Sequence, residues 1–102
     1  MKLVWTKHAH ADRRRIREYI ARHAPAAAMT LDHRFSKTAS LLLNHPYLGR
    51  PGRVSGTREL VVHQNYILVY DLGSDVVRVL RVLHAALHWP PREKNTNPEG
   101  LA

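Results

Sequence analysis

Two arginines and two histidines interrupt or end apolar segments in the second half of the chain: Arg58, His63, Arg81 and His84. Burying such a group without a partner costs roughly 1–3 kcal/mol or more, so each needs a reason for its place. Histidine can move a proton near neutral pH, and a guanidinium can stabilise the charge on a phosphorane. These groups are the minimum set for cleaving an RNA phosphodiester, and the sequence therefore offers a candidate ribonuclease site.

A structural role is the alternative for the same residues. Both arginines could pair with carboxylates, and both histidines could end strands as half-buried hydrogen-bonding groups. The carboxylates concerned are Glu59, Asp71 and Asp75. Arg81 and His84 are three positions apart, so they point to opposite faces of an unbroken strand. A shared site needs a bulge or a strand end near residue 83, or else Arg78, which shares a face with His84, replaces Arg81.

The first half of the chain must supply elements that support these residues. Residues 2–5 form a short apolar run that ends at Thr6, which predicts a strand followed by a helix N-cap. A helical period then begins near residue 9, with apolar side chains on one face and arginines on the others. Pro25 suits the first turn of a second helix, whose period extends to about residue 44. Two helices joined so closely predict an antiparallel hairpin.

Three strands are predicted over residues 57–63, 66–72 and 76–83, which are rich in β-branched, leucine and aromatic residues. The connector over 45–52 holds two prolines and two glycines and ends the helical part. The short turns between the strands predict an antiparallel meander. The third strand is apolar on both faces and is expected to be central. The predicted fold class is α+β, in the order βααβββ, with an N-terminal strand and a helix hairpin packed on a small antiparallel sheet.

The 102 residues suffice for one domain with one core, which we expect over residues 1–90. Residues 91–102 hold almost nothing apolar to bury, so we predict a mobile tail. The formal net charge of +8 comes from residues 1–53, which hold 11 basic and 3 acidic side chains, while the rest hold 5 of each. Such a field favours nucleic acid, an acidic protein segment or anionic lipid as a partner.

Several kinds of site are excluded by composition. The absence of cysteine excludes a disulfide framework, a thiolate metal site and a cysteine nucleophile. No carboxylates accompany the close histidine spacings, so no metal and no cofactor are expected. No phosphate-binding loop or serine hydrolase motif is present. No apolar run approaches about 20 residues, and the opening segment is too short for a signal peptide, so we expect a cytoplasmic protein without a membrane partner.

Four short segments carry a family resemblance: HPYL at 45–48, GTRELVV at 56–62, NYILVY at 65–70 and VLHA at 82–85. In this order and spacing they resemble the RelE/ParE toxins of bacterial type II toxin–antitoxin modules. The predicted order of elements matches as well, so the resemblance covers residues 2–90. It implies a growth-inhibiting toxin that a partner antitoxin, encoded beside it, keeps silent.

The resemblance implies one of two activities. RelE-like members cut mRNA in the ribosomal A site, whereas ParE-like members inhibit DNA gyrase and are not nucleases. Catalytic residues of the ribonuclease members fall where this chain has Arg58, Arg81 and His84. The basic pair that RelE places before the first hairpin strand is represented only by Arg50 and Arg53, and no tyrosine follows His84. These departures favour the ParE-like branch; the alternative is a ribosome-dependent mRNA endoribonuclease.

The basic first half suits the acidic, extended or helical segment that antitoxins commonly wrap around such toxins. We therefore expect a hetero-oligomer with the cognate antitoxin, docked on the helix hairpin and the sheet edge by strand addition or by a helix in a groove. The arginines expected to contact the antitoxin or the target are Arg13, Arg14, Arg17, Arg50 and Arg53. A plain basic adaptor or nucleic-acid-binding module is the third hypothesis.

Overall fold

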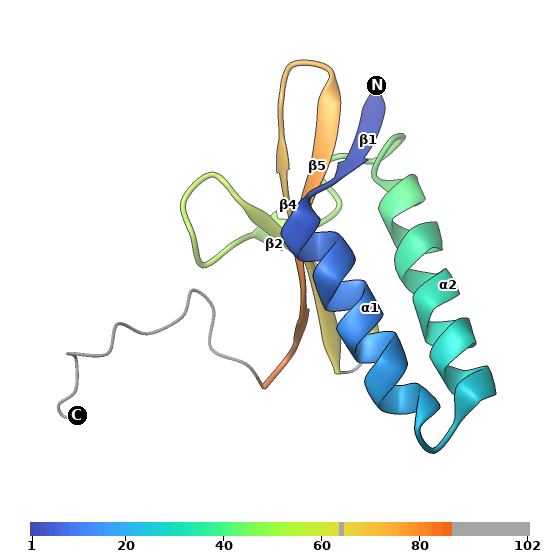
Figure 1. The fold of residues 1–102 in the computed structure, drawn as a ribbon. Coiled ribbons are helices and arrows are strands. Elements are labelled where there is room, and N and C mark those ends of the chain that lie inside the picture. The colour runs from blue at the N-terminus through green and yellow to red at the C-terminus, as the bar shows by residue number, and fades with distance from the viewer. Residues whose placement is uncertain (64, 87–102) are drawn as a thin grey trace, which may run out of the picture.

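Two helices cover one face of a five-stranded sheet (Figure 1). The computed structural model describes residues 1–63 and 65–86. The helices are α1 (Lys7–Ala21) and α2 (Pro25–Leu41). The strands are β1 (Lys2–Trp5), β2 (Arg50–Pro51), β3 (Arg58–His63), β4 (Tyr66–Leu72) and β5 (Val76–His84). The predicted domain boundary at residue 90 and the predicted tail over 91–102 lie outside the described residues.

The sheet has the strand order β1-β5-β4-β3-β2. The α+β fold and the meander of the three long strands are confirmed, because β4 pairs antiparallel with both β3 and β5. β1 adds to β5 in parallel, which the long connection between them permits, so the complete sheet is mixed. β5 is therefore an interior strand along its first half, as its two apolar faces predict. The short β2 lies within the connector over 45–52, where Arg50 and Pro51 give no strand signal.

Thr6 caps α1, as predicted, and also ties the helix to the sheet. Its hydroxyl accepts a hydrogen bond from the Ala9 N–H at 3.1 Å and donates one to the Leu80 carbonyl at 2.9 Å. Its own backbone N–H donates to the Val79 carbonyl at 3.0 Å. Because β1 ends at this point, α1 continues along the edge of β5 that β1 leaves open.

Pro25 begins α2, as predicted, but the helix ends at Leu41 rather than near residue 44. Over 42–44 each backbone N–H donates to the carbonyl three residues earlier, which is a tighter turn than an α-helix makes. Pro46 cannot continue a helix, so the chain leaves the hairpin here.

The core lies between the helix hairpin and the sheet. Its main cluster consists of Ala9, Phe35, Ala39, Leu68, Val79 and Val82. A second cluster joins Leu42 at the end of α2 to Tyr70 and Val77 of the sheet. Ile16 and Tyr66 are only partly buried against the main cluster. Cavities between the helices and the sheet open at the end of the hairpin where the two helices join.

Candidate functional site

A buried carboxylate binds Arg81 at the edge of β5. Asp12 is 3% exposed and accepts hydrogen bonds from Arg81 Nε at 2.8 Å and Nη2 at 3.0 Å. It also accepts the Val82 N–H at 2.9 Å, a donor that β1 no longer pairs. The hydrogen bond to Asp12 raises the pKa of the Arg81 guanidinium, which therefore keeps its charge at neutral pH. Asp12, on α1, is thus a carboxylate partner of Arg81 that the sequence did not indicate, since the carboxylates expected there were Glu59, Asp71 and Asp75.

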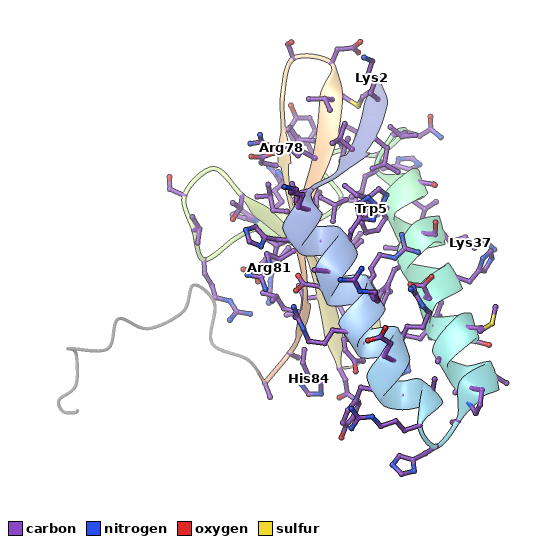
Figure 2. All side chains as sticks on the ribbon, viewed as in Figure 1. Lys2, Trp5, Lys37, Arg78, Arg81 and His84 are labelled. Carbon is purple, nitrogen blue, oxygen red and sulfur yellow. The ribbon has the colours of Figure 1, made fainter. Side chains whose placement is uncertain are left out.

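A bulge in β5 decides which charged residues share a face. Leu80 is an extra residue, because the register with β4 shifts just before Arg81. The shift reverses the alternation, so Arg78 and His84 point to opposite faces of the sheet. Arg78 forms an exposed ion pair with Asp71 at 2.7 and 3.0 Å. The predicted replacement of Arg81 by Arg78 is therefore wrong. Figure 2 shows Arg78, Arg81 and His84 in succession along the strand.

His84 ends β5 beside Tyr66. The two rings have centroids 5.2 Å apart and an interplanar angle of 78°. His84 Nδ1 accepts a hydrogen bond from the Ala86 N–H at 3.1 Å, which leaves Nε2 for other contacts. Arg81 and His84 both line a recess of about 160 Å³ between α1 and β5. The two residues share this recess, although alternation points them to opposite faces, because the Arg81 side chain extends along the strand edge to Asp12.

Arg58 and His63 stand at opposite ends of β3 and do not reach this recess. The Arg58 guanidinium donates to the Gly49 carbonyl at 2.6 Å and lies 4.9 Å from the centre of the Tyr47 ring. Arg58 therefore has no carboxylate partner in the described residues. His63 lines a separate cavity of about 550 Å³ together with Tyr66, and its buried Nδ1 has no hydrogen-bond partner within the described ranges. Of the predicted ribonuclease set, Arg58 is thus apart from the other three, and His63 lines a different cavity from Arg81 and His84.

An open groove runs between the helix hairpin and the ends of β4 and β5; we call it the hairpin groove. Tyr66 lines both the larger cavity and a neighbouring one of about 410 Å³, and His84 continues from there into the recess beside Arg81. Its basic side chains, besides Arg81, are Arg15, Arg34, His63 and His84, and its larger apolar ones are Ile16, Ile20 and Leu31. Asp12, already paired, is the sole carboxylate among the described residues that line the groove.

Tyr66 is the central residue of the hairpin groove, and sequence reasoning misses it. Burial raises the pKa of its phenol, and the nearby Tyr19 raises it further, so the hydroxyl stays protonated at neutral pH. A tyrosine at the start of an apolar strand is typical of core packing, which is why no sequence signal separates it from other strand residues.

The arginines of α1 divide between internal contacts and solvent. Arg13 forms a two-point ion pair with Asp32 of α2 at 3.0 and 2.9 Å and lies 4.4 Å from the centre of the Trp5 ring. Arg17 contacts the same carboxylate at 3.3 Å. Arg14 is exposed and forms no ion pair with any described residue. Arg13 therefore holds the two helices together, while Arg14 is available at the surface.

Arg50 and Arg53 surround Glu59, a buried carboxylate on β3. Glu59 accepts the Arg53 backbone N–H at 3.0 Å and lies 3.3 Å from the Arg53 guanidinium and 3.6 Å from that of Arg50. Neighbouring residues of a strand face opposite sides, so Glu59 points away from Arg58. The edge of the sheet at β2 thus holds three guanidinium groups and one carboxylate, which leaves it positively charged.

In the described ranges, no group of three or more histidine, aspartate or glutamate side chains is placed to hold a metal ion. Neither α1 nor α2 has the length and apolar character needed to cross a bilayer.

Comparison with known proteins agrees with the resemblance found in the sequence. Residues 3–89 match the family described as ParE toxin of type II toxin–antitoxin system, parDE. The protein Y4kP of Sinorhizobium fredii is 37% identical over 90 residues, which cover 87% of this chain and 93% of that protein. Toxin RelE2 of Caulobacter vibrioides is 36% identical over 85 residues, which cover 83% of this chain and 96% of that protein.

The fold is shared with a solved structure of the chromosomal ParDE toxin–antitoxin system from P. aeruginosa. The two chains superimpose with a TM-score of 0.75 at 23% identity, over 82% of this chain and 95% of that one. At this identity the likeness establishes the fold, and the sequence matches establish the family. The chain belongs to the ParE toxin family of type II toxin–antitoxin systems.

Proposed function

We propose that this toxin arrests growth by binding DNA gyrase in the cytoplasm, without acting as a nuclease, and that a cognate antitoxin neutralises it. The observation that carries this choice is the ion pair between Asp12 and Arg81. A guanidinium that stabilises a phosphorane must direct its N–H donors at the phosphate. Arg81 directs Nε and Nη2 at a buried carboxylate instead, and Arg58 lies in another part of the molecule. The family match supports the same branch.

The antitoxin, in this proposal, occupies the hairpin groove. The groove combines an apolar wall with three basic side chains, Arg34, His63 and His84, that have no carboxylate partner among the described residues. A fourth, Arg15, contacts Asp12 at 3.2 Å. A segment with apolar residues on one face and carboxylates beside them fits such a surface in shape and charge. The edge of β3 offers a second contact, because β2 pairs with only two of its residues, Arg58 and Glu59. A strand of the antitoxin could extend the sheet along the rest of this edge.

Ribosome-dependent mRNA cleavage is the second candidate, and one observation favours it. Tyr66 places a phenol beside His84. This phenol could replace the tyrosine that the sequence after His84 lacks. In such a site His84 would take the proton from the 2′-hydroxyl, and Tyr66, whose phenol is protonated at neutral pH, would serve as the proton donor. The name of the Caulobacter relative, RelE2, points to the same branch.

A histidine substitution separates the two candidates. We expect His84→Ala to retain growth arrest within about twofold of the wild-type level, because no chemical step is lost. Purified wild-type toxin should inhibit supercoiling by gyrase, and RNA from induced cells should show no new cuts within translated codons. His33→Ala, at an exposed position on α2, is the matched control. Loss of growth arrest in His84→Ala alone, with antitoxin binding and thermal stability intact, would establish the nuclease instead.

A further inference from the structure

Two exposed apolar side chains project from the connector between α2 and β2. Tyr47 is 71% exposed and Leu48 is 52% exposed. Figure 1 shows that this connector follows the end of α2, at the opposite end of the hairpin from the turn between α1 and α2. The hairpin groove lies near that turn, and Figure 2 places His84 at the same end. The connector is therefore a surface separate from the groove.

The backbone that carries these side chains is held by a buried hydroxyl. Tyr70 is fully buried, and its hydroxyl donates to the Pro46 carbonyl at 2.8 Å and accepts the Gly49 N–H at 2.9 Å. A Cβ at Gly49 would come within 2.8 Å of the same hydroxyl, so only glycine permits this close approach. The Leu48 N–H donates to the His45 carbonyl at 3.1 Å and closes the turn. The connector is thus fixed on both sides of its two exposed residues.

Arg58 holds both the Tyr47 ring and the backbone of the connector in place. Its guanidinium lies against one face of the Tyr47 ring at 4.9 Å and bonds the Gly49 carbonyl at 2.6 Å. An aromatic ring that is exposed but already ordered loses little conformational entropy on binding.

The charge around this surface is positive. Arg58, which lies against Tyr47, has no carboxylate partner among the described residues. Arg50 and Arg53 pair with Glu59, which points to the other face of the sheet, so they are not part of this surface. The unpaired guanidinium of Arg58 matches a partner surface that carries a carboxylate beside an apolar recess. Tyrosine and arginine are also enriched where proteins bind one another tightly.

We propose that the connector surface, made of Tyr47, Leu48 and Arg58, binds the acidic surface of the toxin's protein target. This inference rests on the proposed function, since it takes the target to be a protein. A protein fits better than RNA, because Arg58 covers one face of the Tyr47 ring and the aliphatic Leu48 offers no stacking surface. Arg58 is in this view a positioning residue for Tyr47 and has no catalytic role.

The test uses the full chain with Tyr47 and Leu48 both changed to alanine. We expect growth arrest to be lost and binding to purified gyrase to weaken roughly tenfold or more. Antitoxin binding and the thermal midpoint should stay at wild-type values, because neither side chain contributes to the core or the groove. Met29→Ala, which removes a side chain that is 70% exposed, should leave growth arrest unchanged.

The possible outcomes test three statements separately: that this surface contacts the target, that the target is a protein, and that this protein is gyrase. Full growth arrest by the double variant would overturn the inference, and so would a parallel loss of antitoxin binding, which would assign the surface to the antitoxin. Weakened binding to single-stranded RNA, measured with a labelled oligonucleotide, would overturn the assignment to a protein. If wild-type toxin fails to bind gyrase while growth arrest still depends on Tyr47 and Leu48, the gyrase proposal is wrong and the connector surface stands as the contact with another protein.

Discussion

Asp12 on α1 and Arg81 on β5, 69 positions apart, form a two-point ion pair at the place where β1 no longer covers the edge of β5. The same carboxylate accepts the Val82 N–H, so it replaces the backbone carbonyl that a longer β1 would have supplied. Arg81 therefore helps to join α1 to β5, because its charged guanidinium binds the Asp12 carboxylate.

Removing the carboxylate should destabilise the fold. Asp12→Ala leaves the Val82 N–H unpaired and removes the carboxylate that both Arg81 and Arg15 contact, and we expect the free energy of unfolding to fall by about 2–4 kcal/mol. Urea denaturation measures the change. Glu18→Ala, at an exposed position of the same helix, should change stability by less than about 0.5 kcal/mol. Equal stability of the two variants would show that the ion pair does not hold α1 to β5.

Reversing a charge at the hairpin groove should weaken antitoxin binding. Arg34→Glu places a carboxylate where the proposed antitoxin segment carries its own, and we expect the dissociation constant to rise roughly tenfold, most clearly at low salt. Calorimetric titration of the variant with purified antitoxin measures this. The control is Lys7→Glu, an equal charge change at an exposed position outside the groove. An equal effect of both variants would point to net charge as the cause.

Removing one oxygen should loosen the connector surface. Tyr70→Phe deletes the hydroxyl that joins Pro46 to Gly49, and we expect a loss of about 1–3 kcal/mol of stability, because buried polar groups are left unpaired. Growth arrest should fall as well, since Tyr47 loses its fixed support. Amide hydrogen exchange over residues 45–49 should accelerate in this variant. Unchanged exchange would contradict the role assigned to the hydroxyl.

Stability should fall at alkaline pH through Tyr66. Its pKa in the folded chain lies above the ordinary value of 10.0, first because of burial and then because of Tyr19. The folded state therefore holds this proton more tightly than the unfolded chain, and its contribution to stability is complete below pH 10 and is lost as the pH rises through the folded pKa. Denaturant midpoints from about pH 9 to pH 11 measure the loss. Tyr66→Phe should flatten this dependence, whereas Tyr47→Phe, which changes an exposed tyrosine, should not.

Local sequence pattern was sufficient for both helices and for four of the five strands; the exception is β2, whose Arg50 and Pro51 give no strand signal. Thr6 precedes a helical period and caps α1, Pro25 occupies the first turn of α2, and the β-branched segments after residue 57 form the meander. These features depend on neighbours within a few positions, because helix and strand periods and cap preferences are short-range properties. The same is true of the motifs that pointed to the family.

Tertiary structure decided which side chains meet. The sequence placed Arg58, His63, Arg81 and His84 in apolar segments, but the bulge at Leu80, the register of β3 and the end of β1 distributed them over separate places. The sequence by itself determined the family, the order of elements and the basic first half. Only the folded chain determined that Asp12 binds Arg81, that Tyr66 lies at the centre of the groove and that Tyr70 holds the backbone on both sides of Tyr47. Each of these contacts joins residues far apart in the sequence, and helix and strand periods extend over only a few positions.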